Sequence, residues 1–297
     1  MITLNLANAD KSDIKFTISK FPDGQQSITL PYTSFKNNEV VKIKSRLNNF
    51  RDLELIICAN QALLEAGATE IHLYVPYFLG ARSDRKFVDG SSNYLKTVIC
   101  PIINSQNFKT VTVLDPHSDV LEACLNNFKK IDNTELVKFA LTKIDNTNSA
   151  RENLYLVSPD AGALKKVYHV AETFSINKII VANKHRDIVT GKITHTEVPG
   201  LDNTPGHKNF VIVDDICDGG RTFIELAKAI REIRPQEIFN DKIYLIVTHG
   251  LFSAGLKELN KHFNGIYTTD SICSMDDPGF SLANDNQTHK LSQQSVF

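Results

Sequence analysis

The sequence predicts an α/β fold in which mostly parallel sheets are flanked by helices. Short apolar runs alternate with longer amphipathic segments almost throughout the 297 residues, and this alternation is typical of parallel strands joined by helices. It passes through two cycles, which the polar stretch at 126–135 separates. The length also suits two domains. We therefore expect a first domain over residues 1–133, a second over 134–283 and a polar tail over 284–297.

In the first cycle, period-two alternation and short apolar runs indicate strands, and apolar residues at helical spacing indicate helices. Strands are expected at Ile14–Ile18, Val40–Lys44, Ile71–Tyr77 and Thr110–Leu114. Helices are expected at Phe50–Ala66, where Gly67 suits a C-cap, and at Asn93–Ile103, which Pro101 interrupts or ends.

The second cycle repeats the pattern, and several of its strands end in acidic or small residues. Strands are expected at Leu136–Leu141, Leu154–Val157, Lys178–Ala182, Phe210–Val213, Ile243–Thr248 and Gly265–Thr269. Helices are expected at Ala161–Phe174, Thr222–Ile233 and Ala254–His262. Ligands of open α/β sheets bind beyond the carboxyl ends of the strands, so the residues after each strand are the candidates for a functional site.

The composition argues against several classes of protein. The formal net charge is −1, whereas a non-specific nucleic-acid binder carries a basic excess. The five cysteines are scattered without zinc-ligand spacing, which favours a reducing, cytoplasmic setting. No secretory signal is visible, and no apolar run approaches the roughly 18–20 residues that span a bilayer. We expect no nucleic-acid or membrane partner.

The strongest local signal is the stretch VIVDDICDGGRT at 211–222. Its apolar strand ends in Asp214 and Asp215, which could accept hydrogen bonds from ribose hydroxyls or hold a divalent cation. The turn that follows consists of Asp218, Gly219, Gly220, Arg221 and Thr222. Its glycines let backbone N–H groups turn inward, and the helix that follows adds N–H groups and a positive dipole end. The stretch indicates a phosphate site; an ordinary capped βα turn is the structural alternative.

This stretch resembles the ribose-phosphate motif of type I phosphoribosyltransferases and of ribose-phosphate pyrophosphokinases, also called phosphoribosyl pyrophosphate synthetases. Further segments resemble the pyrophosphokinases and occur in that family's order. These are FPDGQ (21–25), VPYFLGARSDRK (75–86), LDPHSD (114–119), LVSPDAGALKK (156–166), NKHR (183–186) and THGLFS (248–253). The resemblance implies two phosphoribosyltransferase-like domains with the active site between them. It also implies an enzyme that transfers the diphosphoryl group of ATP to O1 of ribose 5-phosphate, giving phosphoribosyl pyrophosphate and AMP.

The resemblance implies a role for each matching residue. Lys184 and Arg186 are expected to be catalytic and to stabilise the transferring phosphates. ATP is expected to contact Phe21, Asp23, Gln25, Arg82, Ser83, Asp84, Lys86 and His117. Mg²⁺ is the expected cofactor, held in part by His117 and Asp160. Ribose 5-phosphate is expected at Asp214, Asp215 and the turn 218–222. Without the resemblance, these residues would be a solvated basic pair, a structural histidine, helix caps and ordinary turns.

The family also implies a homo-oligomer, hexameric or dimer-based, with active sites near subunit interfaces. Several positions depart from the family's pattern. Gln25 replaces Glu, Ser83 replaces Gln, Gly219 replaces Thr and Arg221 replaces Gly, and the loop 87–94 carries no arginine. Three alternatives therefore stay open. They are the same chemistry on a bulkier ribose ester such as ADP-ribose, a catalytically weak regulatory paralogue of a synthetase, and a type I phosphoribosyltransferase.

Overall fold

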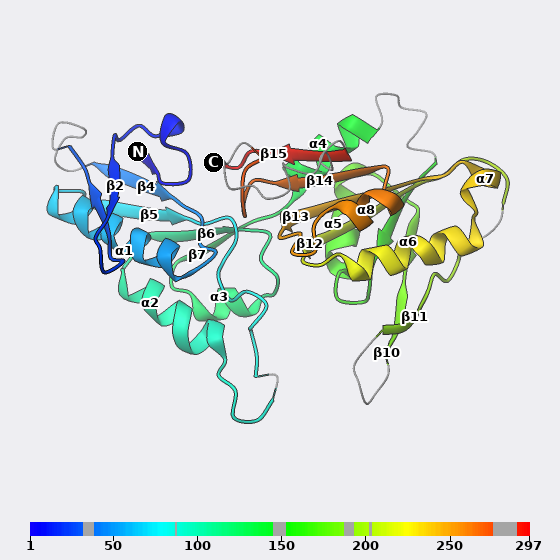
Figure 1. The fold of residues 1–297 in the computed structure, drawn as a ribbon, viewed down its shortest axis with the longest axis horizontal. Coiled ribbons are helices and arrows are strands. Elements are labelled where there is room, and N and C mark those ends of the chain that lie inside the picture. Colours follow the sequence, from blue (N-terminus) through cyan, green and yellow to red (C-terminus); the bar gives the residue numbers. More distant parts are fainter. Residues whose placement is uncertain (32–38, 87, 145–152, 187–192, 202–203, 276–289) are drawn as a thin grey trace. The chain divides into compact units, whose positions relative to one another are not determined.

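The computed structural model describes residues 1–31, 39–86, 88–144, 153–186, 193–201, 204–275 and 290–297. The chain divides into two compact units (Figure 1). Unit 1 comprises Met1–Asp132 together with Val296–Phe297, and unit 2 comprises Asn133–Ser295.

Unit 1 contains a parallel five-stranded sheet in the order β1-β4-β5-β6-β7. Its strands are β1 (Ile2–Asn5), β4 (Val40–Lys44), β5 (Glu70–Tyr74), β6 (Thr110–Leu114) and β7 (Phe128–Ile131). The helices are α1 (Phe50–Glu65), α2 (Cys100–Ser105) and α3 (Val120–Cys124), with a 3₁₀ turn at Ala9–Lys11 and a π-helical turn at Leu95–Ile99. The antiparallel strands β2 (Thr17–Lys20) and β3 (Gln26–Thr29) form a separate hairpin.

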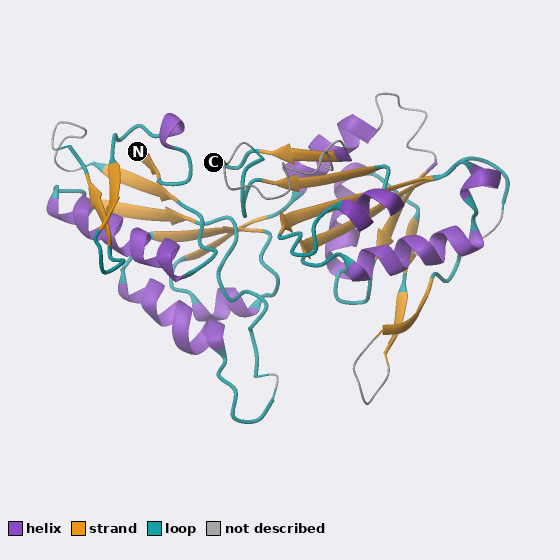
Figure 2. Cartoon of the chain, viewed as in Figure 1, coloured by secondary structure: helices purple, strands orange, loops and turns teal. Residues whose placement is uncertain are grey.

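The sheet of unit 1 buries one face more deeply than the other. Along β5, the buried Ile71 and Leu73 alternate with the half-buried His72 and Tyr74, as the period of two in a strand requires. The buried residues join the apolar side chains of α1, α2 and α3 in a single core, and Figure 2 shows these helices on one side of the sheet. In the described part of unit 1, helices therefore cover one face of the sheet.

Unit 2 contains a parallel six-stranded sheet in the order β15-β14-β13-β12-β8-β9. Its strands are β8 (Leu154–Ser158), β9 (Ile179–Val181), β12 (Asn209–Cys217), β13 (Lys242–Gly250), β14 (Gly265–Thr269) and β15 (Leu291–Gln294). Its helices are α4 (Thr134–Ile144), α5 (Leu164–Phe174), α6 (Arg221–Ile233), α7 (Gln236–Phe239) and α8 (Lys257–His262). The antiparallel hairpin of β10 (Asn183–Arg186) and β11 (Ile193–Glu197) lies between β9 and β12 in sequence.

The sheet of unit 2 is covered on both faces, as expected from the sequence. Val211 and Val213 of β12 pack in one core with α4 and α5, whereas Phe210 and Ile212 pack in a second core with α6 and α8. The apolar part of β12 is thus buried on both faces, which explains why it is a continuous apolar run. Together the units confirm the α/β fold with mostly parallel sheets flanked by helices.

Three sequence expectations about elements were wrong. The segment expected to be a strand at Leu136–Leu141 lies within helix α4, because its buried residues recur at helical spacing and a short apolar run does not distinguish the two. The strand expected at Ile14–Ile18 is instead β2, shifted to Thr17–Lys20. The stretch expected to be a polar tail contains β15, which pairs with β14 through backbone hydrogen bonds that polar side chains do not prevent; residues 284–289 lie outside the described residues.

A buried ion pair joins the end of α6 to the start of β13. Arg234 and Asp241 are both 0% exposed. Arg234 Nε donates to Asp241 Oδ2 over 2.6 Å, and Arg234 Nη2 donates to Asp241 Oδ1 over 3.2 Å. The guanidinium also donates to the carbonyl oxygens of Thr204 and Gly206. Because both charged side chains are fully buried, each charge depends on its partner.

We expect Arg234→Met to lower the free energy of unfolding by about 3–5 kcal/mol, because the Asp241 carboxylate would stay buried without its cation. Urea unfolding followed by circular dichroism measures the change. The matched control is Lys228→Met, which removes an exposed ion pair of 3.1 Å with Glu225 and should cost less than about 1 kcal/mol. Equal losses in the two variants would contradict this reading of the buried pair.

Candidate active site

The predicted ribose-phosphate residues lie at one edge of the sheet of unit 2. Strands β8 and β12 are parallel neighbours, with Ile212 opposite Val157. The turn containing Asp160 follows β8, and Asp214 and Asp215 lie near the end of β12. Because parallel neighbours end at the same edge of a sheet, the topology brings these groups to one place.

The two carboxylates of β12 occupy an environment that disfavours charge. Asp215 is 6% exposed, and its backbone N–H donates to Asp214 Oδ1 over 2.9 Å. Burial raises the pKa of Asp214 well above its usual value, and the charge of Asp215 raises it further. Lys166 acts in the opposite direction, with its Nζ 3.5 Å from Asp215 Oδ1. Adjacent acidic groups of this kind suit hydrogen bonding to hydroxyl groups of a ligand.

The turn after β12 leads directly into α6, and its backbone lies close to the side chain of Leu259. Gly220 has a φ of +78°, and a Cβ at this position would lie 2.9 Å from Leu259 Cδ2. Helix α6 begins at Arg221 without a side-chain cap, and the N–H of Phe223 donates to the carbonyl oxygen of Gly220. A helix start of this kind can bind an anion through its first N–H groups. Arg221 is exposed and Thr222 half-buried. This geometry is suited to a phosphate.

A second turn, residues 250–253, holds the first in position. The N–H groups of Leu251 and Phe252 donate to the carbonyl oxygen of Cys217. Ser253 donates to Asp218 twice, from its N–H to the carbonyl oxygen over 3.2 Å and from its hydroxyl to Oδ1 over 2.5 Å. Sequence reasoning recognised the run THGLFS by resemblance but did not connect Ser253 with Asp218. That contact joins residues 35 positions apart and has no local signal.

Asp160 organises the turn after β8. Its Oδ1 accepts from the N–H of Ala163 over 3.1 Å, and its carbonyl oxygen accepts from the Ser158 hydroxyl over 2.8 Å. The half-buried carboxylate is an oxygen donor of the kind that Mg²⁺ prefers. In the described part of the chain, no three His, Cys, Asp or Glu side chains gather into a metal-binding cluster. Mg²⁺ commonly binds through one or two carboxylates, waters and substrate phosphates, so the donor set fits that ion.

Lys184 and Arg186 lie on β10, the first strand of the hairpin that follows β9. Lys184 pairs with Thr196 and Arg186 with Ile193, and the irregularity in the ladder lies between His185 and Arg186. The structure thus places the backbone of both predicted catalytic residues in an extended strand, whereas their side chains lie outside the described part of the molecule.

The predicted ATP residues belong to unit 1. Phe21, Asp23 and Gln25 form the turn between β2 and β3, where the N–H of Gln25 donates to Asp23 Oδ1 over 3.1 Å. Phe21 is 51% exposed, so its ring face is accessible for stacking. Gly24 has a φ of +101°, which the tight turn requires.

The basic segment, residues 82–86, lies where the loop 85–92 begins. The carbonyl oxygen of Ser83 accepts from the N–H of Leu95 over 3.2 Å, and the carbonyl oxygen of Asp84 accepts from the Asn93 side chain over 3.0 Å. Arg82 and Lys86 are exposed. These bonds close the base of the segment 85–92, in which Phe87 lies outside the described residues.

His117 is exposed in the segment after β6. It follows the buried Asp115, which has a φ of +43° and whose N–H donates to the carbonyl oxygen of Ile131. The positive φ redirects the chain just beyond the strand. The predicted site residues therefore form two groups, one in each unit. Lys166 and Ser253, which touch the unit 2 group, were missed.

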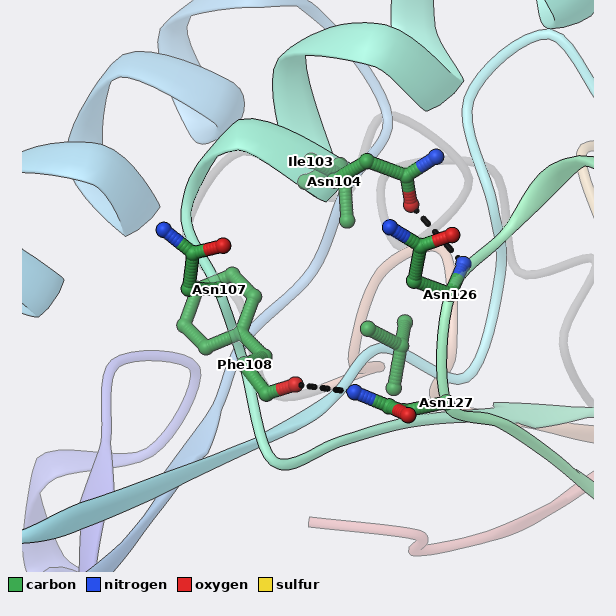
Figure 3. A pocket seen from close by; sticks show the side chains of 7 residues that line it. Ile103, Asn104, Asn107, Phe108, Asn126 and Asn127 are labelled. Carbon is green, nitrogen blue, oxygen red and sulfur yellow. Dashed lines mark hydrogen bonds between the residues drawn. The ribbon is translucent and has the colours of Figure 1, made fainter.

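A small cavity of about 40 Å³ lies in unit 1 near the start of β6 (Figure 3). Asn104 Oδ1 accepts from the N–H of Asn126, and Asn127 Nδ2 donates to the carbonyl oxygen of Phe108. The cavity therefore lies at the amino end of the parallel strands, away from the edge where ligands of such sheets bind.

In the described part of the chain, no helix is long and apolar enough to span a membrane.

The chain is similar to known proteins in sequence and in fold. A family model for the phosphoribosyl transferase domain matches residues 127–258. The ribose-phosphate pyrophosphokinase of Saccharolobus solfataricus is 26% identical over 80% of this chain and 80% of its own length. That of Pyrococcus abyssi is 27% identical over 87% and 85%. A phosphoribosylpyrophosphate synthetase from Mycobacterium smegmatis has a similar fold, with a TM-score of 0.76 at 17% identity over 97% of this chain and 88% of that one.

The paired carboxylates and the turn at 218–222 lie within the stretch that the phosphoribosyl transferase domain model matches. Across both units, the chain is similar in sequence to ribose-phosphate pyrophosphokinases.

We expect Gly220→Ala to destabilise the protein by about 1–3 kcal/mol, because a side chain would be strained at this φ and would press on Leu259. Thermal and urea unfolding measure the loss. Gly219→Ala is the control, because its Cβ would meet neighbours only at 3.8 Å. The interpretation is wrong if the two variants are equally stable.

Proposed function

We propose that this protein is a ribose-phosphate diphosphokinase. It transfers the diphosphoryl group of ATP to O1 of ribose 5-phosphate and forms phosphoribosyl pyrophosphate and AMP. The observation that carries the proposal is the combination at one edge of unit 2. Paired carboxylates and an uncapped helix start after a glycine turn lie in a chain that matches curated ribose-phosphate pyrophosphokinases over 80–87% of its length.

In this proposal, unit 2 binds ribose 5-phosphate. The N–H groups of residues 218–222 and the dipole of α6 hold the 5-phosphate. Asp214 and Asp215 accept hydrogen bonds from the ribose hydroxyls. A site built to hydrogen-bond a hydroxyl rejects analogues that lack this hydroxyl by about 10⁴–10⁵-fold, because its buried polar groups would be left unpaired. These carboxylates therefore select the sugar.

The chemical step is an in-line displacement at the β-phosphorus of ATP. A bond forms between O1 and the β-phosphorus while the bond from the β-phosphorus to the α,β-bridging oxygen breaks; AMP leaves with that oxygen, and the O1 proton passes to solvent. Such transfers depend on positioning and charge neutralisation. Lys184 and Arg186 supply positive charge to the transferring phosphates in the transition state.

The segments of unit 1 bind ATP. Phe21 stacks on the adenine and Asp23 accepts from its amino group, while Arg82 and Lys86 contact the phosphates and Ser83, Asp84, Gln25 and His117 complete the set. Asp160 and His117 hold Mg²⁺, which would neutralise phosphate charge when bound. In the same proposal, the protein is a cytoplasmic homo-oligomer with its active sites near subunit interfaces.

The exposed Arg221 at the first position of α6 favours a second acceptor, a bulkier ribose ester such as ADP-ribose. Arg221 lies within the turn 218–222, and a guanidinium can pair with a further phosphate group.

The direct test of the proposal is AMP release from ATP and Mg²⁺ by the purified protein, with ribose 5-phosphate, with ADP-ribose and without an acceptor. We expect AMP formation that requires ribose 5-phosphate, checked by chromatography of the nucleotides. Formation with ADP-ribose alone would assign the second acceptor. No AMP with either acceptor, despite ATP binding by calorimetry, would favour a regulatory paralogue and overturn the proposal.

We expect Lys184→Ala to reduce kcat by about 10²–10³-fold with little change in KM, because its contacts strengthen in the transition state. Steady-state kinetics of AMP release measure both constants. Lys228→Ala is the control, since Lys228 forms an exposed ion pair on α6. An unchanged kcat in Lys184→Ala would remove this residue from the mechanism.

A further inference from the structure

Lys166 forms an ion pair with the buried Asp215 of the predicted ribose-phosphate site. It lies in the first turn of α5, which follows the turn containing Asp160. Its Nζ is 3.5 Å from Asp215 Oδ1, and the two side chains are 19% and 8% exposed. An ion pair this sheltered is weakly screened by salt and water, unlike the surface pairs of this protein.

The position of Lys166 follows from the topology of unit 2. Helix α5 follows β8 and packs against both β8 and its neighbour β12. Strand β12 continues beyond the last residue that pairs with β8, so Asp215 extends past the end of that strand. A side chain from the first turn of α5 can reach it there. The contact spans 49 residues in sequence and connects the turn after β8 with the end of β12.

Asp215 needs such a partner because of its surroundings. It is 6% exposed and directly follows Asp214, so two acidic groups share one partly desolvated place. A buried carboxylate without a cation is strongly disfavoured in its charged form. Lys166 offsets this cost and restricts the orientation of the Asp215 side chain.

We propose that Lys166 is a positioning residue for ribose-phosphate binding, which acts by fixing the Asp215 carboxylate in the orientation that accepts the ribose hydroxyls. This inference rests on the proposed function of the same site and assigns a role to a residue that touches no substrate in it. Lys166 thereby sets the affinity for the sugar phosphate, whereas the transfer step depends on other cations.

The test compares Lys166→Met, Lys166→Arg and the control Lys165→Met. Lys165 is exposed on the same turn of α5, so it carries the same change of charge and shape without the buried contact. We expect Lys166→Met to weaken ribose 5-phosphate binding by about 10–100-fold in calorimetry and to raise its KM similarly, with kcat within about threefold. Lys166→Arg should restore most of the affinity, and Lys165→Met should match the parent protein.

A double-mutant cycle with Asp215→Asn tests whether Lys166 acts through Asp215. We expect Lys166→Met/Asp215→Asn to bind ribose 5-phosphate within about twofold of Asp215→Asn alone, because the second change removes nothing further. Losses that multiply would mean that Lys166 acts on the substrate by itself and would overturn the proposal. A lower melting temperature in Lys166→Met with unchanged affinity would assign it to stability alone, which also overturns it.

The binding readout separates this inference from the proposed function. If the parent protein binds ribose 5-phosphate but releases no AMP, the diphosphokinase proposal fails, and the cycle still decides the role of Lys166. If the parent protein does not bind ribose 5-phosphate, the positioning role is overturned together with the site.

Discussion

Strand β12 is buried on both faces of its sheet, and this burial determines where the polar groups of unit 2 lie. Four consecutive apolar residues, Phe210–Val213, supply alternate side chains to two separate cores. A polar side chain inside that run would lose its hydration without gaining a partner. Asp214 and Asp215 therefore occur only where the strand leaves its neighbour β8. The end of this strand also determines where the phosphate turn and helix α6 begin, and where the 250–253 turn makes its contacts.

The same edge combines close packing with a helix start that has no side-chain cap. A Cβ at Gly220 would lie 2.9 Å from the side chain of Leu259, and the hydrogen bonds from Leu251, Phe252 and Ser253 hold the preceding residues. The helix start that follows has no side-chain cap. The first N–H groups of a helix have no partner within the helix, so a rigid turn directly before them is preorganised for an anion. Affinity then costs little reordering of the protein.

Charge at this edge is balanced locally and not by the whole chain. The formal net charge of −1 carries no information about a phosphate ligand. Two carboxylates side by side would repel a phosphorylated sugar if both stood free, and burial together with Asp215 raises the pKa of Asp214. Lys166 offsets the remaining charge from a neighbouring helix. Hydroxyl groups of a sugar can therefore be accepted close to a phosphate without a large electrostatic cost.

Local pattern determined the fold class and much of the candidate site. The apolar run, the two carboxylates and the glycine turn of residues 211–222 are adjacent in sequence, so their chemistry was readable there. The tertiary structure decided the features that depend on residues distant in sequence. Helix α4 formed from a run that also suited a strand, because the apolar residues that the core buries recur at helical spacing. Strand β15 formed from a polar segment, because backbone hydrogen bonding to β14 needs no apolar side chain. Lys166 and Ser253 joined the site through contacts 49 and 35 residues apart, which depend on the packing of a helix and a turn beside β12.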